Sequence, residues 1–210
     1  MLGTINFGAF LISGIILNLT PGSDTIYILS RSISSGRKAG VLSVLGISSG
    51  VIVHTLLAAF GLSTILAKSA AAFNTIKYLG AIYLIYLGVK TLLDKGNNVL
   101  LLNAEQVSSK SIYLQGLMTN VLNPKVALFF LAFLPQFVDP HSGLGAIPFI
   151  FLGATFVITG TIWCLIIAIF SSFATNKFRE NTKIATGLSK LCGVIYIALG
   201  LKLLQTRTQA

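Results

Sequence analysis

Two short segments, Asn18-Leu-Thr20-Pro21-Gly22 and Asn120-Val-Leu-Asn123-Pro124-Lys125, lie inside long apolar runs about a hundred residues apart. Each segment places a proline where a continuous helix would need a backbone N–H. Lipid offers no water to a broken helix, so such a break is tolerated at membrane depth only where protein or a wet cavity surrounds it. Two breaks at matching positions in the two halves of a membrane chain indicate the binding site of a transporter.

The composition is that of an integral membrane protein. Of 210 residues, 54% are hydrophobic and 10% are charged, and the mean hydropathy is +0.87. A soluble domain carries about 25% charged residues. The residue ranges 1–23, 39–67 and 140–176 contain no Asp, Glu, Lys or Arg. The net charge of +10 is scattered along the chain and forms no patch with aromatic residues, so we expect a lipid bilayer as partner and no nucleic acid.

Six apolar runs are long enough to cross a membrane, which takes about 20 residues. The first run lacks a basic n-region and a small-residue cleavage site, so we expect it to be retained as a span. Lysines interrupt the third and sixth runs near their ends, where a lysine stem can reach the interface. We predict an all-α integral membrane protein with six transmembrane helices, at residues 4–32, 39–66, 70–93, 112–138, 144–173 and 184–204.

The third and sixth runs also contain an internal repeat. Gly80-Ala-Ile-Tyr83 matches Gly193-Val-Ile-Tyr196, and Leu87-Gly88-Val-Lys90 matches Leu199-Gly200-Leu-Lys202. Leucine-rich composition could imitate part of this similarity. If the halves are copies, each has three spans, so the second must insert upside down relative to the first, as in many secondary transporters. We therefore predict one transporter domain made of two inverted repeats, 1–93 and 112–210, joined by the polar linker 94–111.

Basic residues in the connections predict the orientation. The connections after the first, third and fifth spans hold ten Lys and Arg, whereas the opposite side holds four. Basic residues favour the cytoplasmic side, so both termini are expected to face away from the cytoplasm.

Each break is expected to begin a second half-helix. Thr20-Pro21 and Asn123-Pro124 each resemble an N-cap followed by proline at the first helical position. The prolines cannot bond the carbonyls of Leu17 and Asn120, so these carbonyls and the nearby polar side chains, including Asn18, would be available to a polar ligand. The alternative is a simple kink whose polar groups are satisfied by neighbouring Ser and Thr.

Two charges lie next to the breaks. Asp24 falls in the first turn after Pro21, where a carboxylate also complements the helix dipole. Lys125 is less easily explained, because a cation at a helix N-terminus opposes that dipole. Charges inside a membrane usually mark a pathway or a pair. Either these two neutralise each other, or they bracket a zwitterion such as a free amino acid.

His54 is the only histidine within a predicted span. It belongs to a stripe of small residues that should face the bundle. It is therefore either a structural hydrogen-bond donor or, since imidazole titrates near neutral pH, a carrier of protons. The stripe is Ser43, Gly46, Gly50, His54, Ala58 and Gly61; the fifth span has a similar stripe of Gly153, Gly160, Cys164 and Ala168, and these faces would permit a homodimer.

Several kinds of site are absent from the sequence. No P-loop, HExxH motif or nucleophile elbow occurs, so we expect neither ATP-driven transport nor an enzyme. The five acidic residues make a metal cage improbable, and Cys164 and Cys192 are interpreted as apolar packing residues. We expect no cofactor and no bound metal.

The motifs resemble those of the lysine exporter/homoserine–threonine efflux (LysE/RhtB) family over nearly the whole chain. The resemblance rests on Asn18-Leu-Thr-Pro-Gly-Ser-Asp24, Arg31-Ser-Ile-Ser-Ser-Gly36-Arg-Lys-Ala-Gly40, Gly116-Leu-Met-Thr-Asn-Val-Leu-Asn-Pro-Lys125 and Phe129-Phe-Leu-Ala-Phe-Leu-Pro-Gln-Phe137. One departure is Ser23, where the family commonly has a second proline after Pro-Gly.

The resemblance implies a multi-pass protein of the bacterial inner membrane that exports amino acids or their derivatives, driven by the proton gradient. His54 is a position often occupied by histidine in similar sequences, and we interpret His54 and Asp24 as the groups that couple export to protons. The substrate-binding residues predicted from the breaks and from this resemblance are Asn18, Thr20, Pro21, Gly22, Asp24, Asn120, Asn123, Pro124 and Lys125.

Two other readings remain open from the sequence. The chain could export a metal ion or another small solute, although metal ligands are scarce. From a different class, it could be an intramembrane enzyme. Such an enzyme needs a nucleophile and a base, and His54 with a nearby serine is the only candidate pair.

Overall fold

The computed structural model describes residues 2–62, 70–93 and 108–171, together with the single positions 190, 194, 197, 198, 200, 201 and 204. These parts of the chain are helices joined by loops, and their β-type pairing is limited to one isolated bridge between Thr4 and Val138. The prediction of an all-helical membrane-type fold is therefore confirmed.

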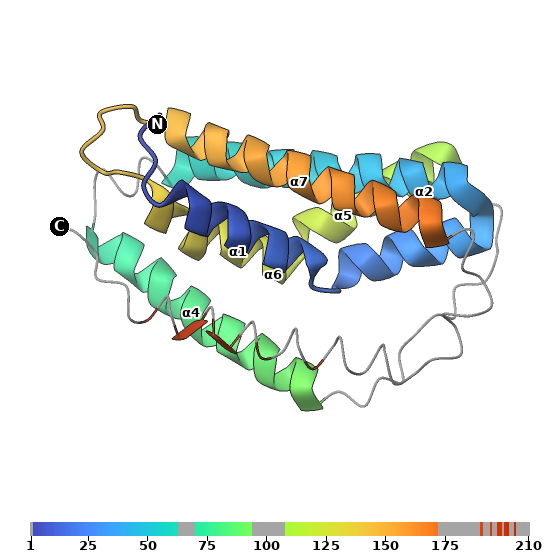
Figure 1. The fold of residues 1–210 in the computed structure, drawn as a ribbon, viewed down its shortest axis with the longest axis horizontal. Coiled ribbons are helices and arrows are strands. Elements are labelled where there is room, and N and C mark those ends of the chain that lie inside the picture. Colours follow the sequence, from blue (N-terminus) through green and yellow to red (C-terminus); the bar gives the residue numbers. More distant parts are fainter. Residues whose placement is uncertain are drawn as a thin grey trace.

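The first predicted span is broken as expected. Helix α1 (Phe7–Leu19) ends at the first break, and α2 (Ser23–Leu57) begins after it. A straight helix of 35 residues would be about 52 Å long, well beyond the roughly 30 Å hydrocarbon core. Instead, Gly36 has φ 81° and ψ 177°, a conformation that glycine adopts far more readily than other residues. Figure 1 shows the chain reversing direction within α2, at the right of the view.

The two arms of α2 correspond to the second half of the first predicted span and to the second span. Ile28 on one arm packs with Val44 on the other in a single buried cluster. The second arm continues through a π-helical turn, η1 (Ala58–Leu62). One assigned helix thus accounts for parts of two predicted spans, because the reversal at Gly36 needs no intervening loop.

The second broken span is α5 (Ser109–Val121) followed by α6 (Pro124–Leu128), and the segments on the two sides of the break are bent by 45°. Beyond α6 the chain forms a π-helical turn, η2 (Phe129–Phe133), and a 3₁₀ turn, η3 (Leu134–Phe137). Pro135 lacks the N–H that would continue an α-helical ladder, which accounts for the change of helix type there.

Two unbroken helices match their predicted ranges. Helix α4 (Ala70–Leu93) corresponds to the third span and α7 (Ile147–Ser171) to the fifth. The sixth predicted span, 184–204, lies mostly outside the described residues. One of its described positions, Gly200, lies against α4, where a Cβ would meet the side chain of Ile85 and the carbonyl of Ala81.

Within the described ranges, two helices, Ser23–Gly61 and Ile147–Ser171, are long and apolar enough to cross a membrane. The bent pair Ser109–Val121 and Pro124–Phe137 makes a third if it is counted as one span.

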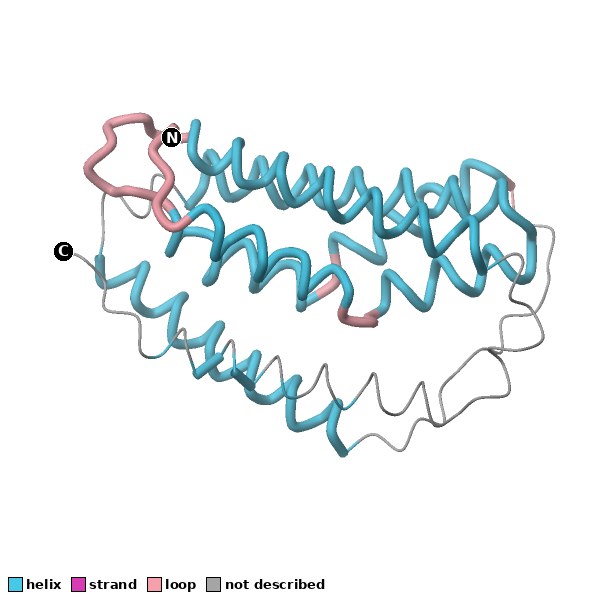
Figure 2. Tube along the Cα trace, viewed as in Figure 1, coloured by secondary structure: helices cyan, strands magenta, loops and turns pink. Residues whose placement is uncertain are grey.

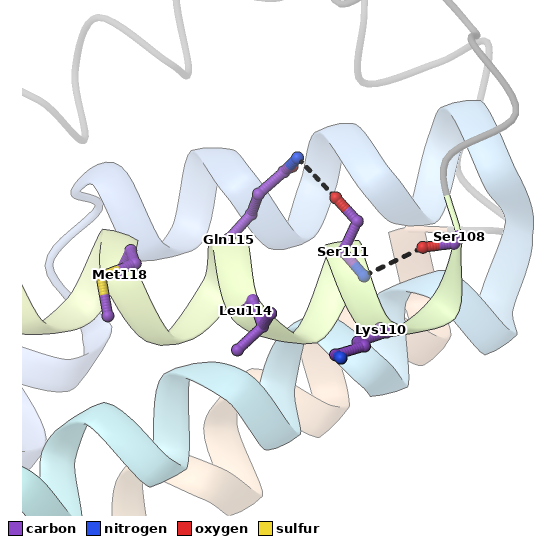
Figure 3. A pocket seen from close by; sticks show the side chains of 6 residues that line it. All are labelled: Ser108, Lys110, Ser111, Leu114, Gln115 and Met118. Atoms are coloured by element: carbon purple, nitrogen blue, oxygen red, sulfur yellow. Dashed lines mark hydrogen bonds between the residues drawn. The ribbon is translucent and has the colours of Figure 1, made fainter.

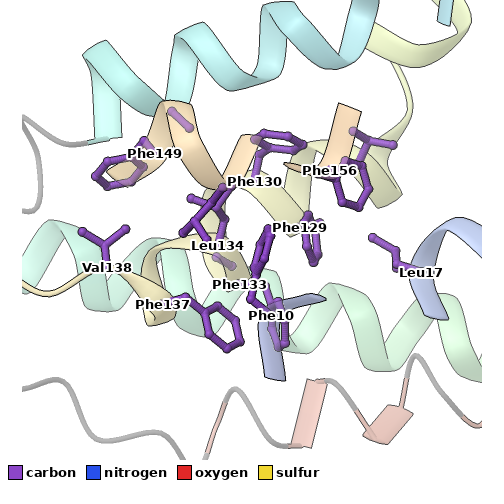
Figure 4. Close-up of a cluster of buried hydrophobic side chains, with 14 of the residues drawn as sticks. Phe10, Leu17, Phe129, Phe130, Phe133, Leu134, Phe137, Val138, Phe149 and Phe156 are labelled. Atoms are coloured by element: carbon purple, nitrogen blue, oxygen red, sulfur yellow. The ribbon is translucent and has the colours of Figure 1, made fainter. Parts of the chain in front are cut away.

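Helix packing brings the two breaks together. The second arm of α2 approaches α5 so closely that a Cβ on Gly46 would collide with the backbone carbonyl of Tyr113. Small residues allow such close packing between membrane helices. Figure 2 shows both breaks as short loop segments near one another in the bundle. To one side lies an aromatic core from α1, η2, η3 and α7 (Figure 4), in which Phe129 and Phe156 stack with centroids 4.7 Å apart.

Candidate functional site

The first break differs from the sequence prediction in its cap. Gly22, rather than Thr20, is the N-cap residue of α2, and Pro21 precedes the helix instead of opening it. Thr20 instead caps the C-terminus of α1, because its hydroxyl donates a hydrogen bond of 2.7 Å to the carbonyl of Ile16. The hydroxyl faces back along α1, so it cannot cap α2.

The second break has the predicted cap. The Asn123 side chain accepts a hydrogen bond of 3.0 Å from the Lys125 backbone N–H, and Pro124 occupies the first turn of α6. The Asn-Pro sequence therefore ends one helix and starts the next within two residues, Leu122 and Asn123.

The position of the Lys125 ammonium explains why a cation is tolerated at the start of α6. The buried Nζ donates to the carbonyls of Thr20 at 3.0 Å and Leu17 at 3.3 Å, at the C-terminus of α1. Cations are stabilised at helix C-termini. Gly22 leaves room for this contact, since a Cβ there would lie 3.2 Å from Nζ.

His54 makes the corresponding contact at the second break. Its Nε2 lies 3.2 Å from the carbonyl oxygen of Asn120, the group that Pro124 cannot bond, and its ring stacks on Phe130 at 5.8 Å. The expectation that the freed carbonyls stay available is therefore wrong in this conformation. A side chain from each half of the chain satisfies the break in the other half, Lys125 at the first break and His54 at the second.

Asp24 and Asn120 form a buried pair with unused hydrogen-bonding capacity. Asp24, 9% exposed, accepts through Oδ2 a hydrogen bond of 2.9 Å from Asn120 Nδ2. The Oδ1 atoms of both residues are buried and have no hydrogen-bond partner in the described structure. Because buried polar atoms are nearly always partnered, these two acceptor oxygens mark a place for a donor.

A cavity of about 30 Å³ lies at this pair. Of the predicted site residues, four line it: Asn18, Asp24, Asn120 and Lys125. The other predicted residues, Thr20, Pro21, Gly22, Asn123, Pro124 and His54, are not part of its wall, and they shape or satisfy the breaks as described above. A cavity of this size holds about two water molecules, so the site is closed to an amino acid in this conformation.

Sequence reasoning missed the wall contributed by α7. The Asn18 side chain donates to the Thr159 hydroxyl at 3.3 Å, and the cavity is also lined by Gly160, Thr161 and Cys164. The stripe of small residues in the fifth predicted span is the signal for this wall, although small residues by themselves indicate only a packing face. The remaining lining is largely apolar: Ile47, Val51, Val126, Phe156 and Val157, with Thr25 and Ser48.

A larger hollow of about 330 Å³ lies elsewhere, beside the first turns of α5 (Figure 3). Its lining comes from one helix face, and its members are Ser108, Lys110, Ser111, Leu114, Gln115 and Met118. It is open and includes no residue of either break, so we assign the site to the smaller cavity.

Two broken helices whose buried charges meet at an enclosed cavity within an apolar bundle are typical of membrane transport proteins. Comparison with known proteins supports this class. The model of the LysE type translocator family matches residues 15–207, and the chain belongs to this family.

Relatives match along nearly the full chain. An uncharacterized membrane protein of Bacillus subtilis, YrhP, is 33% identical over 88% of this chain and 91% of its own length. The leucine efflux protein of Salmonella typhimurium is 30% identical over 96% of this chain and 95% of its own length. An uncharacterized membrane protein of Vibrio cholerae is 28% identical over 93% and 94%. No solved structure matches the chain.

Proposed function

We propose that this protein is a secondary transporter that exports neutral aliphatic amino acids, such as leucine, across the bacterial inner membrane. The observation that carries the proposal is the Oδ1 atom of Asp24, a buried carboxylate oxygen without a partner at a cavity that Lys125 also lines. An ammonium and a carboxylate on one small molecule match this pair of charges. The leucine efflux proteins among the relatives support the same substrate class.

The lining of the cavity supports a role for each part of the substrate. The ammonium would donate to Asp24 Oδ1 and Asn120 Oδ1, the two acceptors without donors. The carboxylate would draw the Lys125 ammonium away from the carbonyls that it now bonds. An aliphatic side chain would lie against the apolar wall near Val51 and Phe156.

Binding must be accompanied by helix movement, because the cavity now has room only for water. We propose alternating access around the two breaks, within six helices arranged as inverted repeats and with both termini outside the cytoplasm. Lys125 bonds the carbonyl of Thr20 at the first break, and His54 bonds the carbonyl of Asn120 at the second. Each contact joins one half of the chain to the other in the closed conformation. The faces of small residues on the second and fifth predicted spans would permit a homodimer, and this stays a prediction.

The proposal also includes coupling of export to protons. Asp24 and His54 are titratable groups that both contact Asn120, Asp24 at its side chain and His54 at its carbonyl. A proton that arrives at either group would alter the hydrogen bonds of the same asparagine. This shared contact gives protonation a direct route to the geometry of the second break.

The test is transport by purified protein in proteoliposomes, offered a panel of radiolabelled amino acids with and without an imposed proton gradient. We expect leucine and similar aliphatic amino acids to be carried against their gradient, and Asp24→Asn to abolish transport in protein that still inserts. Transport of none of the panel, or full activity of Asp24→Asn, would contradict the proposal.

A further inference from the structure

A second buried charge lies on the same helix arm as Asp24. Arg31 follows Asp24 by seven residues, which places it two turns along the same face, about 10.5 Å away. Its side chain is 7% exposed. One terminal nitrogen donates a hydrogen bond of 2.8 Å to Gln115 Oε1, and the guanidinium carbon lies 5.7 Å from the centre of the Tyr27 ring.

The hydrogen bonding of this guanidinium is incomplete. The Nε atom is buried and has no partner, and within the described residues no carboxylate forms an ion pair with Arg31. Its polar neighbour, Gln115, is a neutral amide. A buried charge without a counter-charge is costly, so the arrangement needs an explanation beyond packing.

Positive charge at the cytoplasmic end of this arm does not require the buried cation. Arg37 and Lys38 follow within seven residues, are exposed, and supply the positive charge that orients the span. An arginine that serves only as an anchor would lie at the surface as they do.

The two charges of this arm are held in the same way by α5. Asn120 donates to the carboxylate of Asp24, and Gln115 accepts from the guanidinium of Arg31. A ligand of opposite charge adds a Coulombic attraction that a neutral amide cannot supply, so such a ligand can displace either amide.

We infer that Arg31 is a binding station for the carboxylate of the transported amino acid, on the cytoplasmic side of the central cavity. This inference rests on the proposed function. The substrate carboxylate replaces Gln115 on the guanidinium as the amino acid enters. The amino acid then moves about two helical turns to the cavity, where its ammonium meets Asp24.

The test measures uptake of labelled leucine into inside-out vesicles, with leucinamide as competitor. Leucinamide keeps the ammonium and the side chain but lacks the carboxylate. We expect Arg31→Gln to raise the KM for leucine about tenfold, as the loss of one charge-assisted hydrogen bond predicts. We also expect the preference for leucine over leucinamide to fall by a similar factor, and Arg31→Lys to retain most of it.

Two further variants separate binding from structure. Gln115→Glu places a carboxylate from the protein itself beside Arg31, where it competes with the carboxylate of the substrate. This variant should therefore raise the KM for leucine although no positive charge is lost. Arg37→Gln removes an exposed charge from the same connection and should leave both KM and preference unchanged.

The outcomes distinguish this inference from the proposed function. Parent vesicles that take up neither leucine nor any other aliphatic amino acid above vesicles lacking this protein overturn the proposed function, and the carboxylate station with it. An active parent whose leucine preference is unchanged in Arg31→Gln, or whose KM is unchanged in Gln115→Glu, overturns the station alone. A lower rate with an unchanged preference assigns Arg31 a structural role.

Discussion

Replacing Lys125 with methionine tests the contact between the two breaks. Methionine has a similar length and suits the apolar surroundings, but it donates no hydrogen bond. Thr20 would lose the donor to its carbonyl, whereas the Leu17 carbonyl keeps the Thr20 N–H at 3.2 Å. One newly unsatisfied buried carbonyl costs about 1–3 kcal/mol, and part of this is offset because the buried ammonium no longer has to be desolvated.

The expected result is a moderate loss of stability with a complete loss of transport. For a chain of this size, 1 kcal/mol corresponds to about 2–4 °C in Tm, so a cost of about 1–3 kcal/mol corresponds to about 2–12 °C. The partial offset places the expected fall in the Tm of Lys125→Met in the lower part of that range. The assay is thermal unfolding of purified protein in detergent, followed by the fluorescence of Trp163, the single tryptophan. Lys38→Met, at an exposed position, is the matched control and should leave the Tm unchanged.

Two results would refute the reasoning. If Lys125→Met has the same Tm as the parent, the contact between Lys125 and the Thr20 carbonyl does not stabilise the closed conformation. The double variant Asp24→Asn with Lys125→Gln tests the binding role separately. Recovery of transport in this double variant would mean that the two charges only neutralise each other, because removing one partner alone leaves a charge uncompensated.

Four further substitutions follow from the same geometry. His54→Gln keeps a donor for the Asn120 carbonyl but cannot titrate, so gradient-driven uphill export should fail while downhill exchange survives; normal uphill export would leave His54 a structural role. Pro124→Ala returns an N–H that competes with His54 for the same carbonyl, so export should fall sharply with no loss of Tm. Pro21→Ala should be milder, because Pro21 lies outside α2, and equal export rates in the two variants would contradict this difference. Gly46→Ala should reduce thermal stability by about 1–3 kcal/mol or more, since its Cβ meets rigid backbone. The control is Gly8→Ala, whose added Cβ meets nothing within 4 Å, so its Tm should equal or exceed that of the parent. If Gly46→Ala and Gly8→Ala have the same Tm, the two helices can separate at Gly46 without cost.

The sequence by itself determined the class of fold and the positions of the breaks. Apolar runs of sufficient length predict membrane helices, and proline cannot donate to a helical ladder wherever it lies. These are local properties, so the ranges of α4 and α7 and the N-cap at Asn123 were predicted correctly. The buried position of His54 was also predicted, because its stripe of small residues marks a helix face that packs closely.

The tertiary structure decided which groups meet at the breaks. The Thr20 hydroxyl bonds back to α1, the Lys125 ammonium reaches a carbonyl 105 residues away, and Asn120 joins Asp24 across 96 residues. The Thr20 bond is a local one that competes with capping of α2, whereas the partners of Lys125 and Asn120 are distant in the sequence and no local pattern indicates them. The wall from α7 was missed for a related reason: in a membrane the lipid and the protein interior are both apolar, so hydrophobic periodicity does not tell which face of a helix packs. Only the close approach of helices at their small residues brings the two breaks, and the charges beside them, to a single cavity.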